Sequence, residues 1–218
     1  MMNPLSGFGG DFFDTTLDKS IRSAPIKMGD RLYLWFDATG RLYEMKKDIT
    51  NGGFRKIRMD STTYVGYNYQ AFPFVYDGTI YNLGGYGYWR RNGHLRSYVT
   101  KSHQWEVNML NQEIPITFYV NGDYLFYDFS TGHIYNAGYQ HMNEGVKGRI
   151  TNIDQVMQLN IRAREWKVLG DLSPLLKQFR LERVQIVAMN KQGLLIRLAY
   201  KDFKLLSFRE NKIYNVDG

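Results

Sequence analysis

The chain has 218 residues, no cysteine, a net charge of +7 and 16% aromatic residues. The absence of cysteine excludes disulfides, cysteine-ligated zinc and thiol nucleophiles. An apolar share of 44% is enough for a substantial core and excludes a disordered chain, while the aromatic content favours strands over helices.

We expect no signal peptide in the N-terminal segment, residues 1–20, because it lacks a basic region followed by an apolar one. No apolar run in the chain approaches the roughly 20 residues that span a bilayer. We therefore expect a chain that is soluble as given and has no membrane span. The compartment stays open.

A hairpin is predicted within residues 25–35 and again, 48 residues further on, within residues 73–83. Each copy has Pro at the entrance of its first strand, a Gly/Asp turn, and then an aromatic residue, Tyr33 or Tyr81, in its second strand. Such turns need positive φ, which Gly and Asp tolerate, and the flanking apolar residues make the pattern a hairpin signal. Proline suits a strand position that donates no ladder hydrogen bond.

Two weaker copies follow. The third begins at Pro115 and places its turn at Gly122-Asp123 after three inserted residues, and the fourth lies at residues 187–196 with a turn before or at Gly193. The region 21–218 is therefore expected to hold four repeat units, approximately 21–60, 61–110, 111–170 and 180–218.

A second landmark closes each unit. An aromatic or apolar residue stands seven positions before a Trp or Ile in the pairs Tyr98–Trp105, Leu159–Trp166 and Leu206–Ile213. Phe54 holds the corresponding place in the first unit. The longest interval between these closing residues is assigned to an insertion within residues 137–150.

Two segments leave the secondary structure open. Ser173-Pro174 resembles an N-cap followed by Pro in the first turn of a short helix. Residues 152–159 fit either a helix or a strand that leads to Trp166. An all-β sandwich is the rival architecture, but the 48-residue repeat favours blades.

Four units of about 50 residues, each with about four short strands, match the period of a Kelch propeller blade. In the second unit, residues 79–85 end on the paired glycines of that family, Gly84 and Gly85, and Tyr98 and Trp105 follow at the family's spacing. The chain thus resembles Kelch repeats over most of residues 20–216. The resemblance implies an all-β fold of four Kelch-like β-propeller blades. Since Kelch rings mostly hold six or seven blades, we expect an incomplete ring.

Catalytic motifs are not evident. Gly84–Gly87 lacks the Lys-Ser/Thr of a phosphate loop, and carboxylates such as Asp37 and Asp128 stand at turns, where Asp commonly accepts bonds from backbone amides. His133 and His141 fit no metal-ligand spacing. Galactose oxidase has similar blades, but its copper site needs a Cys that this chain lacks. We expect no enzyme, no cofactor and no metal.

Aromatic residues are densest from Tyr64 to Trp89, where alternate members should face the core. A loop is expected after the glycine pair, and flat rings beside polar donors suit an anchor for a protein or stacking on a sugar. The candidate contacts are Tyr86, Tyr88, Trp89, Arg90 and Arg91, with His133 and His141 near the insertion at 137–149.

A protein partner is the leading hypothesis, and a carbohydrate-binding or carbohydrate-active propeller is the alternative. Nucleic acid ranks third, because the basic residues are spread along the chain and no recognisable module is present.

Overall fold

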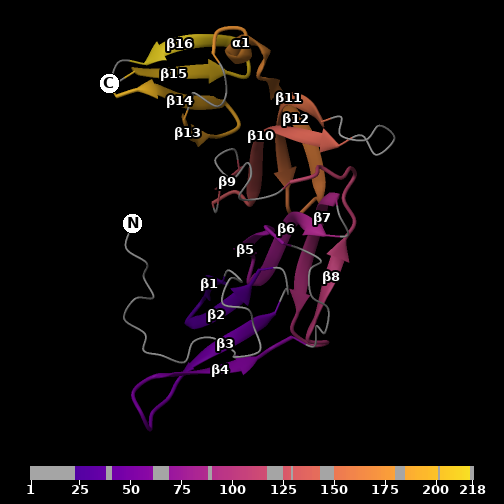
Figure 1. Cartoon of the computed structure of the whole chain (residues 1–218), viewed down its shortest axis with the longest axis vertical. Coiled ribbons are helices and arrows are strands. Elements are labelled where there is room, and N and C mark those ends of the chain that lie inside the picture. The colour runs from indigo at the N-terminus through magenta and orange to yellow at the C-terminus, as the bar shows by residue number, and fades with distance from the viewer. Residues whose placement is uncertain are drawn as a thin grey trace. The chain divides into compact units, whose positions relative to one another are not determined.

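The computed structural model describes residues 23–37, 41–60, 69–87, 90–116, 125–128, 130–142, 150–179, 185–200 and 202–216. The expected N-terminal segment 1–20 lies outside them. Within the described residues, sixteen strands form four antiparallel sheets of four strands each, with one helix of four residues (Figure 1). The predicted all-β architecture of four blade-like units is confirmed. In every sheet the strands follow one another in chain order.

The first sheet contains β1 (Ser23–Met28), β2 (Arg31–Phe36), β3 (Leu42–Lys47) and β4 (Phe54–Arg58). The second contains β5 (Phe72–Tyr76), β6 (Thr79–Gly87), β7 (Arg90–Val99) and β8 (Gln104–Asn108). The third contains β9 (Leu125–Asp128), β10 (His133–Met142), β11 (Ile150–Asn160) and β12 (Glu165–Asp171). The fourth contains β13 (Gln185–Met189), β14 (Gly193–Ala199), β15 (Asp202–Ser207) and β16 (Lys212–Val216).

The first hairpins of the first and second sheets turn where the sequence predicts. Gly29 and Gly78 adopt φ values of +57° and +68°, which glycine reaches without the steric cost of a Cβ. Asp77, also at positive φ, precedes Gly78. The Asp77-Gly78 turn sets the register that pairs Val75 with Ile80 in the second sheet.

The predicted third copy is only partly covered by the structure, because the expected turn at Gly122-Asp123 lies outside the described residues. A hairpin joins β9 to β10, with residues 130–132 in its turn. The Asp128 carboxylate accepts hydrogen bonds from Ser130 N (2.9 Å), Ser130 Oγ (2.6 Å) and Thr131 Oγ1 (2.6 Å), which lowers the pKa of Asp128 to about 2. Phe126 and Tyr127 lie in β9, the first described strand of the third sheet, whereas the sequence places them in the second strand of a hairpin.

The seven-residue spacing has a direct structural meaning. Tyr98 and Trp105, Leu159 and Trp166, and Leu206 and Ile213 are cross-strand partners in the hairpins that join the third strand of a sheet to its fourth. Lys47 and Phe54 form the corresponding pair in the first sheet. The repeat seen in the sequence is thus a repeated hairpin.

Both ambiguous segments are resolved. Residues 152–159 lie in β11, so the strand alternative is confirmed. Helix α1 (Ser173–Leu176) forms as expected with Pro174 in its first turn, but its N-cap is Leu172. Ser173 is instead the first helical residue, and its hydroxyl donates to the Asp171 carboxylate (2.7 Å).

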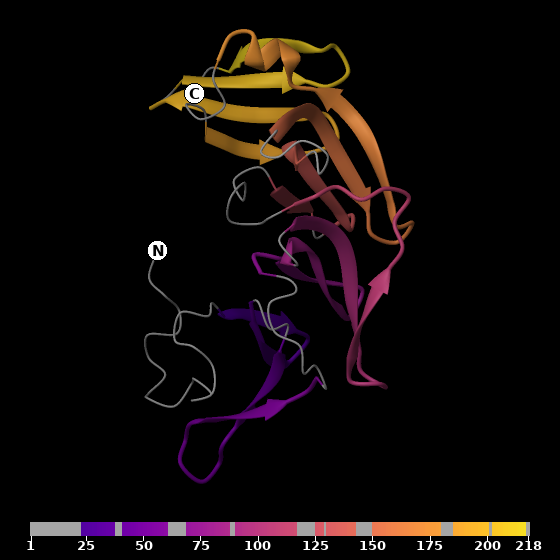
Figure 2. The same ribbon diagram turned by 45° about the vertical axis from the view of Figure 1, so that its right-hand side comes forward.

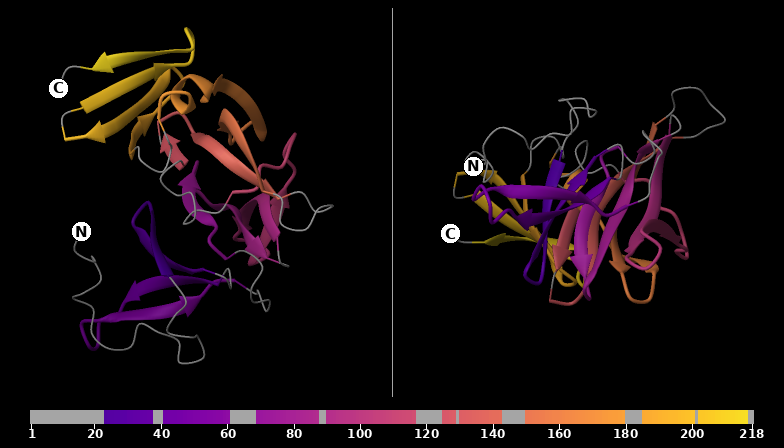
Figure 3. Two further views of the ribbon diagram at one scale, coloured as in Figure 1. Left: turned by 45° about the horizontal axis from the view of Figure 1, so that its top comes forward. Right: turned by 90° about the horizontal axis from the view of Figure 1, so that it is seen from below.

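The chain divides into two compact units, residues 1–91 with 95–108, and residues 92–94 with 109–218. In the first unit the first and second sheets pack face to face (Figure 3). Their shared core comprises Ile26, Tyr33, Trp35, Leu42, Ala71, Ile80 and Tyr98. In the second unit the third and fourth sheets pack in the same way (Figure 2). Their core is centred on Tyr135, Val156, Leu175, Leu194, Ile196 and Leu206.

Residues 109–116 run along the third sheet. The Asn111 side chain acts as a peptide mimic, because it accepts from Trp166 N (2.8 Å) and donates to Trp166 O (2.9 Å). Trp166 itself is buried. Ile116 N donates to Asn92 O (3.1 Å), and Ile114 packs on Gly93, so this segment belongs to the second unit.

Candidate functional site

The predicted loop at residues 86–91 is instead the end of a hairpin. Gly84 and Gly85 lie inside β6, which continues to Gly87, and β7 begins at Arg90. Their φ values of +70° and +113° bend the strand without ending it. Tyr88 and Trp89 lie outside the described residues, as does the side chain of Arg90.

Tyr86 meets a second tyrosine at this end of the sheet. Tyr69, from the segment that leads into β5, forms an antiparallel bridge with it. Tyr69 N donates to Tyr86 O (3.0 Å) and Tyr86 N donates to Tyr69 O (2.6 Å). Directly opposed residues of an antiparallel pair place their side chains on the same face. Both tyrosines are exposed, Tyr69 by 46% and Tyr86 by 37%, so two neighbouring rings face solvent.

The backbone beside Tyr69 is fixed by a buried carboxylate. Gln70 has a φ of +61°, and its N–H donates to Asp37 Oδ1 at 2.8 Å. Asp37 is 1% exposed and follows the end of β2. Ala71, the next residue, is fully buried in the core of the first unit. The first sheet therefore anchors the segment that carries Tyr69.

The strand that carries Tyr86 is fixed by a buried arginine. Arg96 on β7 is 3% exposed, and its Nη1 donates to Asn82 Oδ1 (3.1 Å) and to Gly84 O (3.1 Å). Hydrogen bonds from a charged donor are stronger than those between neutral groups. Arg96 thereby holds the positive-φ bend that directs the end of β6 toward Tyr69.

Of the remaining predicted contacts, the structure describes the side chains of Arg91 and His133. Arg91 is partly buried, and burial lowers the pKa of its guanidinium. His133 begins β10 in the other unit, where its ring tilts against Tyr135 with centroids 6.3 Å apart. Burial, with Lys167 as a smaller cause, lowers the pKa of His133. The side chain of His141 lies outside the described residues.

His133 and His141 cannot share a metal ion. They stand eight residues apart on β10, a separation of roughly 26 Å along an extended strand. Among the residues that the structure describes, no group of three or more His, Cys, Asp or Glu side chains is placed to hold a metal. In the same part of the chain, no helix has the length and hydropathy needed to cross a membrane.

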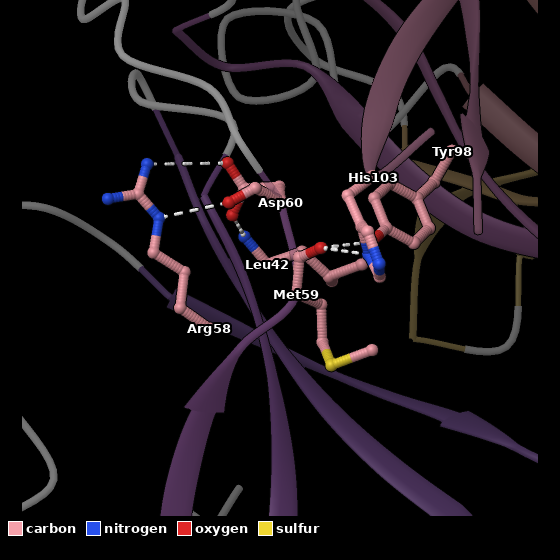
Figure 4. Close-up of polar contacts among 6 residues, drawn as sticks. All are labelled: Leu42, Arg58, Met59, Asp60, Tyr98 and His103. Carbon is pink, nitrogen blue, oxygen red and sulfur yellow. Dashed lines mark hydrogen bonds and ion pairs between the residues drawn. The ribbon is translucent and has the colours of Figure 1, made fainter. Parts of the chain in front are cut away.

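A second polar cluster joins the two sheets of the first unit (Figure 4). Asp60, which follows β4, accepts from Leu42 N at 2.7 Å and forms an ion pair with Arg58 at 3.7 Å. Arg58 Nε also donates to Asp60 O at 3.1 Å. These contacts fold the chain after β4 back onto β3, where Met59 N donates to Leu42 O.

The Met59 carbonyl is the link to the second sheet. It accepts from the Tyr98 hydroxyl and lies 2.8 Å from His103 Nδ1, which must carry a hydrogen, because a carbonyl oxygen accepts and cannot donate. Burial, then the charge of Asp60, raises the pKa of Tyr98 to about 12. Tyr98 and His103 together fasten the second sheet to the first, and the hydroxyl remains a donor at physiological pH.

Sequence reasoning missed Tyr69, Asp37 and Arg96 as parts of one site. Tyr69 is visible in the sequence within an aromatic run, but nothing in the run separates its exposed members from those in the core. Arg96 carries no signal beyond its place two residues before Tyr98.

No family model and no curated protein matches the chain. Among solved structures, 128 chains match. One of them is described as the structure of YjhT, with 13% identity and a TM-score of 0.55 over 89% of this chain. The chain covers 64% of the length of YjhT. At this identity the likeness bears on the fold alone, and it agrees with the blade-like sheets.

Proposed function

We propose that this chain is a noncatalytic scaffold of Kelch-type propeller blades that recognises a protein partner through the end of its second sheet. The Kelch assignment is supported by residues 77–85, which combine a turn, β6 and the glycine pair. The single observation that carries the recognition site is the exposed pair Tyr69–Tyr86, held by two reciprocal backbone hydrogen bonds.

The pair suits protein recognition for two physical reasons. Tyrosine gives a large contact area at a low cost in side-chain entropy, and its hydroxyl finds a partner at the rim of an interface. A surface whose backbone is fixed beforehand also loses less freedom on binding. Asp37 and Arg96 supply that order from the two sides of the bridge.

The hairpin between β10 and β11 is a second candidate contact. Its strands pair as far as Met142 and Ile150, so residues 137–142 of the predicted insertion continue β10. It joins the second and third strands of its sheet, as the β6–β7 hairpin does in the second sheet. The two hairpins are therefore corresponding elements of their sheets.

A glycan is the second candidate ligand, and the same observation favours it, because two exposed rings can stack on sugar faces. A glycan array separates the two classes. Binding of the wild-type chain to defined glycans, lost in Tyr69→Ala/Tyr86→Ala, would favour the carbohydrate.

Photo-crosslinking tests the proposal. A photoreactive amino acid replaces Tyr86 in the full chain, and the same group at Tyr200, which is 87% exposed in the other unit, serves as control. In cells of the source organism we expect one discrete crosslinked protein from position 86, weakened by Tyr69→Ala, and none from position 200. Equal, diffuse crosslinking from both positions would reject the site.

A further inference from the structure

The hairpin of β3 and β4 carries an excess of positive charge. The cations of its two strands are Lys46, Lys47, Arg55, Lys56 and Arg58. Asp48 is the carboxylate of the turn at residues 48–53, and its Oδ1 accepts from Thr50 N at 3.0 Å, so it is engaged by the turn itself. Glu44 Oε2 lies 3.6 Å from Lys46 Nζ, at the base of the hairpin. Among the described residues, no carboxylate forms an ion pair with Lys47 or Arg55, and both are exposed.

The register of the hairpin adds to the repulsion between these charges. Lys46 and Arg55 are direct cross-strand partners, and like charges directly opposed destabilise an antiparallel pair. Lys47 is paired with Phe54 and lies on the other face, because successive side chains of a strand alternate. The hairpin therefore carries cations on both of its faces.

The turn beyond these cations presents an apolar side chain to solvent. Ile49 is 94% exposed, and Phe54, at the start of β4, is 40% exposed. The pairing of β2 with β3 ends at Met45, whereas β3 pairs with β4 as far as Lys47, so the turn projects beyond the other strands of its sheet (Figure 2). Gly52 N donates to the carbonyl of Asp48 (3.0 Å), which fixes the turn that carries Ile49.

The corresponding turns of the other three sheets are shorter and keep their large apolar side chains inside. They span residues 100–103, 161–164 and 208–211, against 48–53 in the first sheet. Ile161 is 3% exposed, and Phe208 packs against the core of the second unit. The exposure of Ile49 is therefore particular to the first sheet and is not a general property of this hairpin.

We propose that the β3–β4 hairpin docks tip first on an anionic lipid membrane, with Ile49 among the headgroups and the cations of both strands against the lipid charges. An anionic lipid surface attracts Lys and Arg, and a buried apolar side chain adds to the binding. Cations on both faces fit an end-on approach, because headgroups then surround the hairpin. A nucleic acid is matched by cations alone and gives Ile49 no apolar surroundings.

Sedimentation with vesicles tests the charge requirement on the full chain. We expect it to bind vesicles of phosphatidylcholine and phosphatidylserine mixed at about 2:1, and not vesicles of phosphatidylcholine alone. Lys47→Gln/Arg55→Gln should weaken partitioning roughly thirtyfold, at about fivefold for each cation. The matched control, Lys101→Gln/Arg209→Gln, removes the same charges from exposed positions in the turns at 100–103 and 208–211 and should stay within about twofold of wild type.

Substitutions at Ile49 test the insertion of the tip. Ile49→Ser should weaken partitioning about tenfold, because the apolar contribution is lost while every charge remains. The chain has no cysteine, so Ile49→Cys gives a single site for an environment-sensitive dye. Its emission should shift to the blue with the mixed vesicles, and the emission of the same dye on Thr100→Cys, at an exposed position of the turn at 100–103, should not.

Equal weakening by the two double variants would overturn the site, because net charge alone would then account for the binding. An unshifted dye at position 49 in vesicle-bound chain would overturn insertion. Failure of wild type to bind the mixed vesicles, with binding to duplex DNA that Lys47→Gln/Arg55→Gln weakens, would assign the hairpin to nucleic acid instead. Circular dichroism of each variant shows that a loss of binding is not a loss of folding.

Discussion

At the residue scale, single polar groups hold the first unit together at positions where the backbone departs from regular structure. The hydroxyl of Tyr98 donates to the carbonyl of Met59. The ring of Tyr98 lies edge-on to that of Trp105, with the two ring centroids 5.6 Å apart. Burial and the charge of Asp60 raise the pKa of this hydroxyl to about 12. Tyr98, which the sequence marks by its seven-residue spacing from Trp105, is therefore the hydrogen-bond donor that joins the two sheets.

This bond predicts a dependence of stability on pH. The pKa of Tyr98 is about 12 in the folded chain, against about 10 in the unfolded chain. The unfolded state therefore loses its proton first, and stability falls as pH rises from 10 to 12. Tyr98→Phe should cost about 1 kcal/mol at pH 7 and remove part of that alkaline loss. Thermal melts at several pH values check this, with Tyr200→Phe expected to match wild type.

Arg96 positions the strand that carries Tyr86 of the proposed site, through its bonds to Asn82 and Gly84. Arg96→Met keeps most of the side-chain volume but leaves Asn82 Oδ1 and Gly84 O without their charged donor. We expect a loss of about 2 kcal/mol in the free energy of unfolding and faster amide exchange at Tyr86. Arg209→Met, at an exposed position, is the control for loss of charge. Unchanged exchange at Tyr86 in the Arg96 variant would refute the positioning role.

At the element scale, the segment 109–116 is held in place by close packing of its backbone against Gly93 as well as by hydrogen bonds. A Cβ on Gly93 would lie 2.4 Å from Ile114 O, and backbone atoms cannot yield as a flexible side chain can. Gly93→Ala should therefore destabilise the chain by about 3 kcal/mol in urea unfolding. At Gly53, the nearest atom to an added Cβ is the side-chain oxygen of Asn51, at 3.2 Å. A comparable loss in Gly53→Ala would show that the contact with Ile114 is not the cause.

The hairpins were predictable where the local signal is unique. Asp77-Gly78 lies between apolar runs with no competing turn nearby, and it turns as expected. The third sheet has two Gly-containing segments within ten residues, and local pattern alone does not rank Gly122 against Gly132. The side-chain bonds of Asp128 to its own turn favour the second segment, and such bonds depend on geometry.

The proposed site was only half predictable for a similar reason. Tyr86 could be selected because it follows the glycine pair. Its neighbour Tyr69 lies before β5, and the bridge between them forms only after β5 and β6 have paired. A loop was expected after Gly85, because paired glycines commonly end a strand. Arg96 keeps the strand going by bonding the carbonyl at the bend.

At the scale of the whole molecule, the proposed contact belongs to one of the two compact units. The Tyr69–Tyr86 pair lies in the unit formed by residues 1–91 with 95–108.

The most direct measurement uses titration calorimetry on the partner that photo-crosslinking identifies. The purified partner is titrated with three forms of the full chain, and the affinity for each form is measured. The wild type and Tyr200→Ala should bind alike. Loss of two central aromatic anchors is expected to cost about 2 kcal/mol, so Tyr69→Ala/Tyr86→Ala should bind roughly 30-fold more weakly. A double variant that remains folded and binds as tightly as wild type would contradict recognition through this end of the second sheet.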